Sequence, residues 1–296
     1  EIAQCLVGSE MCIRDRKYID LHVHSTVSDG TFTPTELVAE AKRCNLSAFA
    51  LTDHDTVRGF EEAKKASEGS GIEVIPGVEI SAAYKKKDIH ILGLLIDPNY
   101  EPLKRSLDAA LLERDQRNAK MAQNLAAGGL DIDIERLTAA FSPGTVLTRA
   151  HFAKFLLETK QIKSMNEAFE HYLNADGPYY VPREYISPEN AIKLIKQAGG
   201  IPVLAHPLVY HLPEEELDTL IARLKDAGLE GLEVFYSSNT GFDEGIVRRY
   251  ANKYHLIMTG GSDFHGANKP HISMGSGKGN LKIPYSVLEN LKAALK

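Results

Sequence analysis

The most informative segment of this chain is Tyr18-Ile19-Asp20-Leu21-His22-Val23-His24-Ser25. It begins with an apolar run, Tyr18 to Leu21, that predicts a β-strand. His22 and His24 follow at a spacing of two, which places both imidazoles on one face of an extended chain. Two imidazoles placed in this way can chelate one metal ion together. The stretch therefore predicts a strand that ends at a metal site.

Further strands and helices are expected along the chain. Short apolar runs, often β-branched, predict strands at 49–52, 74–78, 89–95, 201–205, 231–235 and 256–259. The capping pattern Thr33-Pro34-Thr35-Glu36 begins a helix that ends near Cys44. Helical patterns also cover 56–67, 213–227 and 243–254. Strands alternating with helices indicate β-α-β units, so the expected fold class is α/β, with a barrel as the architecture.

Metal-binding side chains stand at or just after the predicted strands. They are His22, His24, Asp29, His54, Glu79, His90, His206, Asp263 and His265. Strand ends and the loops after them form one face of such a barrel, so these residues should converge on one site. A single histidine is most often packed or solvated. Six of the chain's 11 histidines stand in this pattern with acids among them, which favours a rim that holds several metal ions.

The ligand types limit the metal and the cellular compartment. Imidazoles and carboxylates without thiolates suit zinc, manganese or iron, and they argue against a structural zinc finger. Cys5, Cys12 and Cys44 have no CxxC spacing. We expect them to be free thiols of a reducing compartment, and we therefore expect a cytoplasmic protein.

The composition limits the partners. A balance of 34 Lys and Arg against 40 Asp and Glu gives a net charge of −6, which disfavours stable binding to long nucleic acid. Bound divalent ions would still attract an anion such as phosphate. No apolar run of about 18 residues is present, so no membrane span is expected. The sequence leaves the oligomeric state open.

The chain divides into a barrel and an insertion. Residues 1–16 resemble a translated adapter more than a native leader, and we expect them to lie outside the fold. Barrel-like segments cover 17–100 and 188–296. Between them, 101–187 is helical and charged, with helices predicted at 103–127, 149–158 and 165–173. This insertion either covers the barrel only or acts as a lid and substrate domain, and its place between rim loops favours the second interpretation.

Six ordered motifs resemble those of the PHP (polymerase and histidinol phosphatase) family. They are Asp20-Leu21-His22-Val23-His24-Ser25, Thr52-Asp53-His54-Asp55, Pro76-Gly77-Val78-Glu79, Ile89-His90-Ile91-Leu92-Gly93, Ala205-His206-Pro207 and Gly261-Ser262-Asp263-Phe264-His265-Gly266. The motif Leu147-Thr148-Arg149-Ala150-His151-Phe152-Ala153 and the insertion are most similar to one branch of the family. That branch implies a 3',5'-nucleoside bisphosphate phosphatase or a related 5' to 3' exoribonuclease.

The resemblance implies a distorted (βα)7 PHP barrel with an inserted small helical domain and three divalent metal ions. Manganese is favoured, with zinc, iron or magnesium as alternatives. One ion would take His22, His24, Glu79 and Asp263, a second Glu79, His90 and His206, and a third Asp29, His54 and His265. The implied enzyme is a metal-dependent phosphoesterase that uses metal-activated hydroxide. It would hydrolyse phosphomonoesters of nucleotides, such as adenosine 3',5'-bisphosphate to AMP, the 5' ends of short RNA, or both.

Other residues are assigned to the substrate or to the loops. Arg149 and His151 in the insertion are the predicted contacts to a second phosphate, because Arg binds phosphate bidentately. Lys269 and Arg183 are weaker candidates. Asp20, Asp53 and Asp55 are expected either to accept the second ring N–H of a ligating histidine or to cap loops. Gly275-Ser276-Gly277-Lys278-Gly279 lacks the P-loop spacing and predicts a turn.

Three alternatives to this phosphoesterase remain open. A histidinol-phosphatase-like enzyme would use the same metals, although the insertion and its Arg149 motif favour a nucleotide. An amidohydrolase-type metallohydrolase also uses His-x-His on a barrel strand, but usually with a bridging Lys where this chain has Glu79. The third alternative is a non-catalytic domain that metal ions only stabilise. The presence of a ligand-competent residue at all nine positions argues against it.

Overall fold

The computed structural model describes residues 17–85, 87–174, 177–181 and 186–295. Residues 1–16, which we expected outside the fold, and Arg183 lie outside the described residues.

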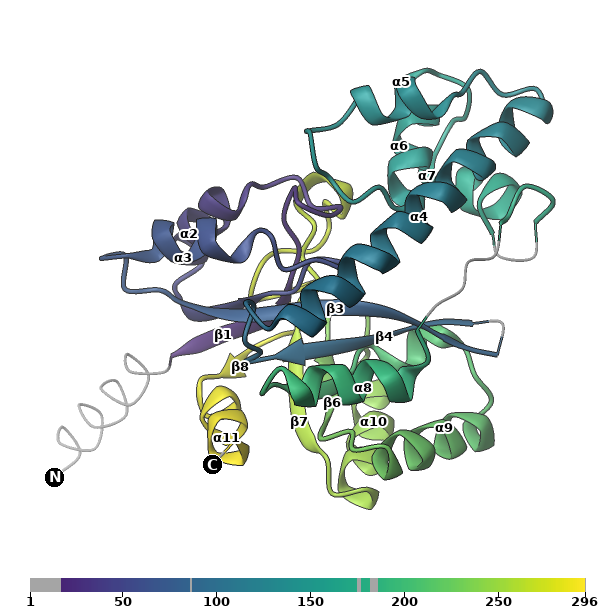
Figure 1. The fold of residues 1–296 in the computed structure, drawn as a ribbon. Coiled ribbons are helices and arrows are strands. Elements are labelled where there is room, and N and C mark those ends of the chain that lie inside the picture. The colour runs from purple at the N-terminus through teal and green to yellow at the C-terminus, as the bar shows by residue number, and fades with distance from the viewer. Residues whose placement is uncertain (1–16, 86, 175–176, 182–185, 296) are drawn as a thin grey trace, which may run out of the picture.

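Eight strands form one sheet in the order β7-β6-β5-β4-β3-β2-β1-β8 (Figure 1). Their bounds are β1 Tyr18–Val23, β2 Leu46–Leu51, β3 Glu73–Tyr84, β4 Lys87–Leu94, β5 Ile201–Leu204, β6 Gly231–Tyr236, β7 Ile257–Gly261 and β8 Ile283–Pro284. β4 runs antiparallel to both β3 and β5, and the short β8 runs antiparallel to β1. The other neighbours are parallel. All the predicted strands are present, and β3 continues to Tyr84, six residues beyond its predicted end, because it pairs with β4 as a hairpin.

The first and seventh strands meet and nearly close the sheet. The backbone N–H of Asp263 donates to the carbonyl of His22 at 2.9 Å, and the N–H of His24 donates to the carbonyl of Phe264 at 3.0 Å. Gly261 permits this approach, because a Cβ at that position would lie 2.2 Å from the Cβ of His22. The expected distorted α/β barrel is confirmed, with the ends of β1 and β7 side by side.

Helices cover the outside of the sheet. They are α2 Pro34–Arg43, α3 Phe60–Ser67, α8 Pro188–Gln197, α9 Glu214–Asp226, α10 Gly241–Lys253 and α11 Ser286–Ala294. The predicted capping box is present, since Thr33 and Glu36 cap α2 reciprocally. The helix predicted at 56–67 begins only at Phe60, because the hydroxyl of Thr56 accepts the N–H of Arg58 in a local turn. No helix among the described residues is long and apolar enough to cross a membrane.

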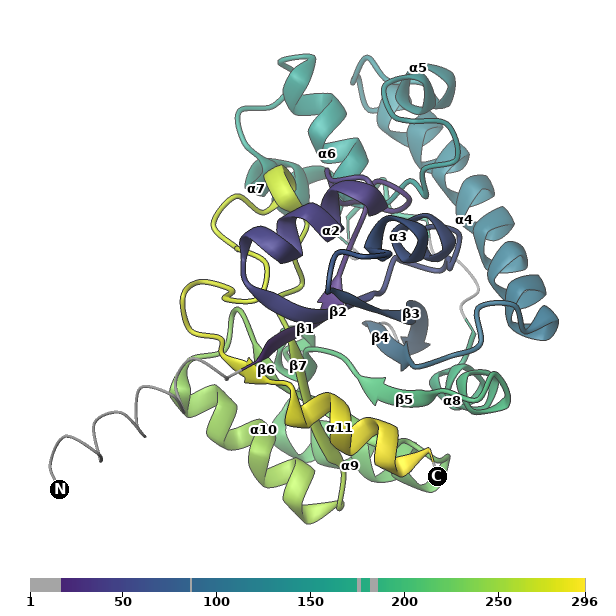
Figure 2. The same cartoon turned by 90° about the vertical axis from the view of Figure 1, so that its left-hand side faces the viewer.

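The insertion forms a helical unit at one end of the barrel, on the opposite side of the molecule from α9, α10 and α11 (Figures 1 and 2). Its elements are α4 Glu101–Ala127, α5 Ile134–Ala139, α6 Arg149–Glu158, α7 Met165–Glu167 and a π-helical turn, Ala168–Tyr172. It has its own apolar core, which includes Met121, Phe152 and Leu156. The start of α4 belongs to the barrel instead, because Leu103 and Leu107 are buried in the same cluster as the β4 side chains.

Hydrogen bonds to backbone carbonyls attach the insertion to the loop after β1. The N–H of Val146 donates to the carbonyl of Val27 at 2.9 Å, and the hydroxyl of Thr145 donates to the carbonyl of Thr26 at 2.9 Å. Because this loop continues to Asp29, the start of α6 is fixed beside one of the predicted metal ligands.

Candidate metal centre

All nine predicted metal ligands lie at one site. They come from the end of β1, the loop after it, the loop after β2, strands β3 and β4, and the loops after β5 and β7. Their ligand atoms fall into four overlapping groups: His22, Glu79 and His206; His22, His24 and Asp263; His54, Glu79 and His90; and His24, Asp29, His54 and His265. Within each group the atoms lie within 4.8 Å of one another. This is the convergence that the strand-end pattern predicts.

Glu79 lies at the centre of the cluster and is almost fully buried. Its Oε2 is 3.3 Å from Nε2 of His22 and 3.2 Å from Nε2 of His24. Its Oε1 is 2.7 Å from Nδ1 of His90 and 3.0 Å from Nε2 of His206. Oε2 also lies 3.1 Å from Nδ1 of His54. The carboxylate therefore faces three imidazoles with Oε2 and two with Oε1, which is the arrangement that a bridging ligand requires.

Asp263 faces the two histidines of β1 from the other side. Its Oδ1 is 3.8 Å from Nε2 of His22 and 3.5 Å from Nε2 of His24. Its Oδ2 accepts from the hydroxyl of Tyr236 at 2.9 Å and from Nζ of Lys269 at 2.6 Å. Tyr236 and Lys269 thus hold the carboxylate so that its other oxygen points at the imidazoles.

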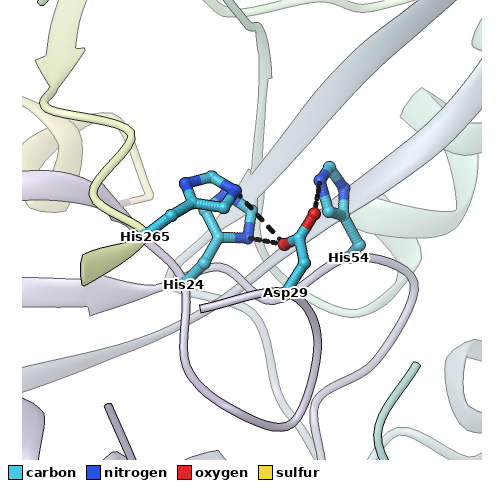
Figure 3. A group of neighbouring side chains, drawn as sticks. All are labelled: His24, Asp29, His54 and His265. Carbon is cyan, nitrogen blue, oxygen red and sulfur yellow. Dashed lines mark ion pairs between the residues drawn. The ribbon is translucent and has the colours of Figure 1, made fainter. Parts of the chain in front are cut away.

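A further group surrounds Asp29 (Figure 3). Oδ1 of Asp29 is 3.2 Å from Nε2 of His265 and 3.7 Å from Nδ1 of His24, and Oδ2 is 3.7 Å from Nε2 of His54. The hydroxyl of Thr148, at the start of α6, donates to Oδ2 at 3.1 Å. The insertion therefore contacts the cluster directly.

The electrostatics keep Glu79 and His24 in the protonation states that metal ligands need. Burial alone would raise the pKa of Glu79, but His90, His54 and His22 hold it well below its usual range. Burial and the neighbouring His265 lower the pKa of His24 to about 3. Glu79 is therefore an anion and His24 a neutral imidazole near neutral pH.

Several buried ligand atoms have no hydrogen-bond partner among the described residues. They are Nε2 of His22, Nε2 of His24, Oδ1 of Asp29, Nδ1 of His54, Nδ1 of His90 and Nδ1 of His206. Buried polar atoms normally have a hydrogen-bond partner. Six such atoms without one in a single cluster therefore indicate that the cluster binds a further group. Divalent cations would satisfy imidazole nitrogens and carboxylate oxygens at once. The donor set therefore fits several metal ions.

Three sharply bent residues shape the rim. Asp55, His206 and Asp263 have φ angles of 51°, 26° and 56°, in the left-handed region that non-glycine residues rarely occupy. Such strain is found preferentially at functional sites, where the surrounding contacts enforce it. The bends turn His206 and Asp263 towards the cluster immediately after β5 and β7.

Glu233, in the middle of β6, is a supporting residue that the sequence patterns missed. It is fully buried, and its two oxygens contact the ring of His22 and the backbone N–H of His206. Nothing in its sequence context marks it, because it stands inside a strand rather than after one.

Asp20 and Asp53 support loops instead of histidine rings. Asp20 accepts from the N–H and the hydroxyl of Ser262 and from the N–H of Gly275. Asp53 accepts from Ser25 and from the hydroxyl of Ser28. For these two residues the prediction that they accept the ring N–H of a ligating histidine is wrong, and the prediction that they cap loops is confirmed. The segment that begins at Gly275 is the predicted turn.

Asp55 also has non-histidine donors. It accepts the N–H of Ser81 at 2.8 Å and pairs with the guanidinium of Arg114 from α4. The aspartate after β2 therefore connects β3 with the long helix of the insertion.

The two residues predicted to contact a second phosphate have different surroundings. Arg149 donates to Oδ2 of Asp88 at 3.2 Å and to the carbonyl of Leu173 at 3.2 Å, and it is partly exposed. His151 is buried, and its Nδ1 accepts the N–H of Thr148 at 2.9 Å as part of a capping box at α6. These contacts give His151 a role in starting the helix, away from the lining of the site.

Two adjoining cavities open at the cluster. A cavity of about 240 Å³ is lined by seven of the nine metal-ligand candidates, all except His22 and His24, and by Lys269. A second, of about 180 Å³, shares Asp29, His54, His90 and Ala150 with it. The second cavity is also lined by Arg114, Arg117 and Arg149. Sequence analysis missed Arg114 and Arg117, because on a charged helix they resemble an ordinary solvated face.

A larger cavity, of about 1020 Å³, lies between α9 and α10 and contains none of the nine ligands. Its charged side chains pair with one another, as in Arg249 with Glu214 and Lys253 with Asp218. The metal cluster and its two cavities therefore form the candidate site.

Comparisons with known proteins agree with this geometry. The PHP domain model matches residues 20–265. The chain is 36% identical to a 5'-3' exoribonuclease of Haemophilus influenzae, over 84% of this chain and 90% of the relative. It is 35% identical to a 3',5'-nucleoside bisphosphate phosphatase of Chromobacterium violaceum, over 83% of this chain and 87% of the relative.

A solved structure is also similar along nearly the whole chain. It is described as an amidohydrolase from Chromobacterium violaceum with bound sulfate and no metal, and it superposes with a TM-score of 0.85 at 33% identity. The match covers 93% of this chain and 96% of the other. With the family match and the buried His, Asp and Glu clusters, it follows that this chain belongs to the PHP domain family and is a hydrolase of the phosphoesterase type.

Proposed function

We propose that this chain hydrolyses phosphate esters of nucleotides, namely a phosphomonoester of nucleoside 3',5'-bisphosphates and the first phosphodiester linkage of short 5'-phosphorylated RNA. The observation that carries the proposal is the arginine-lined cavity beside the metal cluster. A substrate with one phosphate at the cluster and a second phosphate within reach of three guanidiniums suits this pair of cavities. The names of the two relatives, an exoribonuclease and a nucleoside bisphosphate phosphatase, point to the same class of substrate.

We assign the nine clustered residues as ligands of three divalent ions, with manganese favoured. His22, His24, Glu79 and Asp263 would hold one, Glu79, His90 and His206 a second, and Asp29, His54 and His265 the third. The contacts of the two Glu79 oxygens with different imidazoles support a shared ligand. When bound, the ions would supply Lewis acidity at the phosphoryl oxygens and lower the pKa of water for attack on phosphorus.

The chain's own residues orient the substrate. Arg149 and Arg117 line the second cavity and would bind the phosphate that does not react, since guanidinium groups match phosphate oxygens in geometry and charge. Lys269 lines the first cavity beside Asp263 and adds positive charge where the reacting phosphate would lie. The insertion carries Arg117 and Arg149, so we propose that it is the substrate domain.

A phosphate-release assay with manganese, with denaturing gels to follow cleavage of the RNA, tests this proposal. The panel should contain adenosine 3',5'-bisphosphate, AMP, short 5'-phosphorylated RNA and histidinol phosphate, together with amide substrates for an amidohydrolase activity. We expect the highest kcat/KM for the bisphosphate and cleavage of the RNA. Turnover of histidinol phosphate alone, or release of amine rather than phosphate, would refute the proposed substrate class.

A further inference from the structure

Phe169 is an exposed aromatic side chain inside a charged cavity. It lies in the π-helical turn Ala168–Tyr172 of the insertion, and 38% of its surface is exposed. It lines the same cavity as Arg117 and Arg149. The nearby Phe152 and Phe155 are buried in the core of the insertion, so the turn presents one phenyl ring to the cavity while its neighbours stabilise the fold.

The local backbone explains this orientation. The pattern that predicts a regular helix at 165–173 is interrupted after Glu167 by the wider π-helical turn. Such turns are rare and occur frequently at functional sites. Among the described residues, Phe169 makes no ring contact with another aromatic side chain. With 38% of its surface exposed among the described residues, the ring can contact a flat apolar group, although the side chains that line the cavity with it are mostly charged or polar.

We propose that Phe169 stacks on the nucleobase of the substrate whose second phosphate is bound at Arg149 and Arg117. This inference rests on the proposed function and extends it to the base. A nucleotide combines the groups that this cavity complements, because its phosphate suits the guanidiniums and its base suits the phenyl ring. Stacking alone tolerates every base, since each base has a π-face. The site should therefore accept all four bases and bind phosphates without a base less tightly.

A tryptophan reporter tests the stacking directly. The chain contains no Trp, so Phe169→Trp introduces a single fluorophore into the cavity. Rapid mixing with adenosine 3',5'-bisphosphate should quench its fluorescence before hydrolysis, whereas ribose 3,5-bisphosphate should not. Phe242→Trp is the control, because Phe242 is 79% exposed and does not line either cavity of the site. No quench at position 169, or an equal quench at both positions, would overturn the inference.

Steady-state kinetics of the manganese-loaded enzyme give the second measurement. Phe169→Ala should raise KM for adenosine 3',5'-bisphosphate roughly 5- to 100-fold, the range expected for loss of one base–aromatic stack. KM for ribose 3,5-bisphosphate should not change, and Phe169→Tyr should restore the nucleotide KM. Equal losses for both substrates would contradict stacking. If the wild type hydrolyses no bisphosphate, the proposed function fails, and the quench by adenosine nucleotides still decides the role of Phe169.

Discussion

Oε1 of Glu233 lies 2.9 Å from Nδ1 of His22, and both side chains are fully buried. The second oxygen of the same carboxylate accepts the backbone N–H of His206 at 2.8 Å. One carboxylate on β6 thus orients two proposed metal ligands, the ring of one and the bent backbone of the other. An acceptor on the second nitrogen fixes the tautomer of a ligating histidine and raises its basicity.

Glu233→Gln should weaken metal binding while the barrel stays folded. Glutamine has one acceptor oxygen where Glu233 uses two, so either His22 or His206 would face an N–H donor. We expect the apparent affinity for manganese to fall about 10- to 100-fold, measured by competition with a chelator. Glu230→Gln, which changes an acid that pairs with Lys196 just before β6, should leave the affinity unchanged. An unaltered affinity in folded Glu233→Gln would show that Glu233 does not position the ligands.

The metal content of the protein tests the ligand assignment. Nine side chains in four overlapping groups can hold three ions if Glu79 is shared. Elemental analysis of protein saturated with manganese should therefore approach three ions per chain. Removal of the ions with a chelator should lower the melting temperature, because ligands that bind only the folded state stabilise it. A content that stays at one ion under saturating metal would contradict the three-ion assignment.

Glu79→Gln should abolish catalysis without unfolding the protein. The substitution keeps the shape of the side chain but removes the charge that faces five imidazoles. We expect kcat to fall about a thousand-fold or more, as for other losses of transition-state electrostatics. Circular dichroism checks the fold, and metal analysis should show at least one ion lost. Near-normal turnover with an unchanged metal content would mean that Glu79 does not bridge ions.

The sequence predicted the barrel and the cluster because both follow from local patterns. Six of the nine ligands stand at or just after the carboxyl end of a strand, and the strand periodicity is strong in the runs before His22, His54 and His206. Glu79 and His90 instead lie inside the hairpin of β3 and β4. Convergence then follows from the geometry of a barrel whose strand ends form one face. The same local information predicted the capping box at Thr33. It also predicted helix α6 with its observed bounds, Arg149–Glu158.

The residues that sequence reasoning missed depend on contacts between distant segments. Glu233 acts through a histidine 211 positions away, and its strand has no pattern that marks a buried acid as functional. Arg117 faces the site only because α4 crosses from the barrel to the insertion. The sequence predicted that Asp53 lies near the site. Its hydrogen bonds with serines rather than with a histidine depend on the conformation of the loop after β1, which carries Ser25 and Ser28.

Arg149 should decide the preference for bisphosphates. Its guanidinium lines the second cavity and lies 3.2 Å from Oδ2 of Asp88 in a partly exposed pair. A second phosphate on the substrate would compete with Asp88 for this guanidinium, and phosphate carries the larger charge. Adenosine 3',5'-bisphosphate should therefore be preferred over AMP in the wild type.

Arg149→Ala should remove most of this preference, because it deletes a charge-assisted contact of about 1.5 to 3 kcal/mol and leaves Asp88 to repel the second phosphate. The ratio of kcat/KM for adenosine 3',5'-bisphosphate to that for AMP should fall roughly 10- to 100-fold, with kcat/KM for AMP little changed. Asp88→Asn is the informative partner variant, since it frees the guanidinium and should keep or increase the ratio. A preference that survives in Arg149→Ala would assign the second phosphate to Arg117 instead, and equal kcat/KM values for the two substrates in the wild type would contradict a second phosphate site altogether.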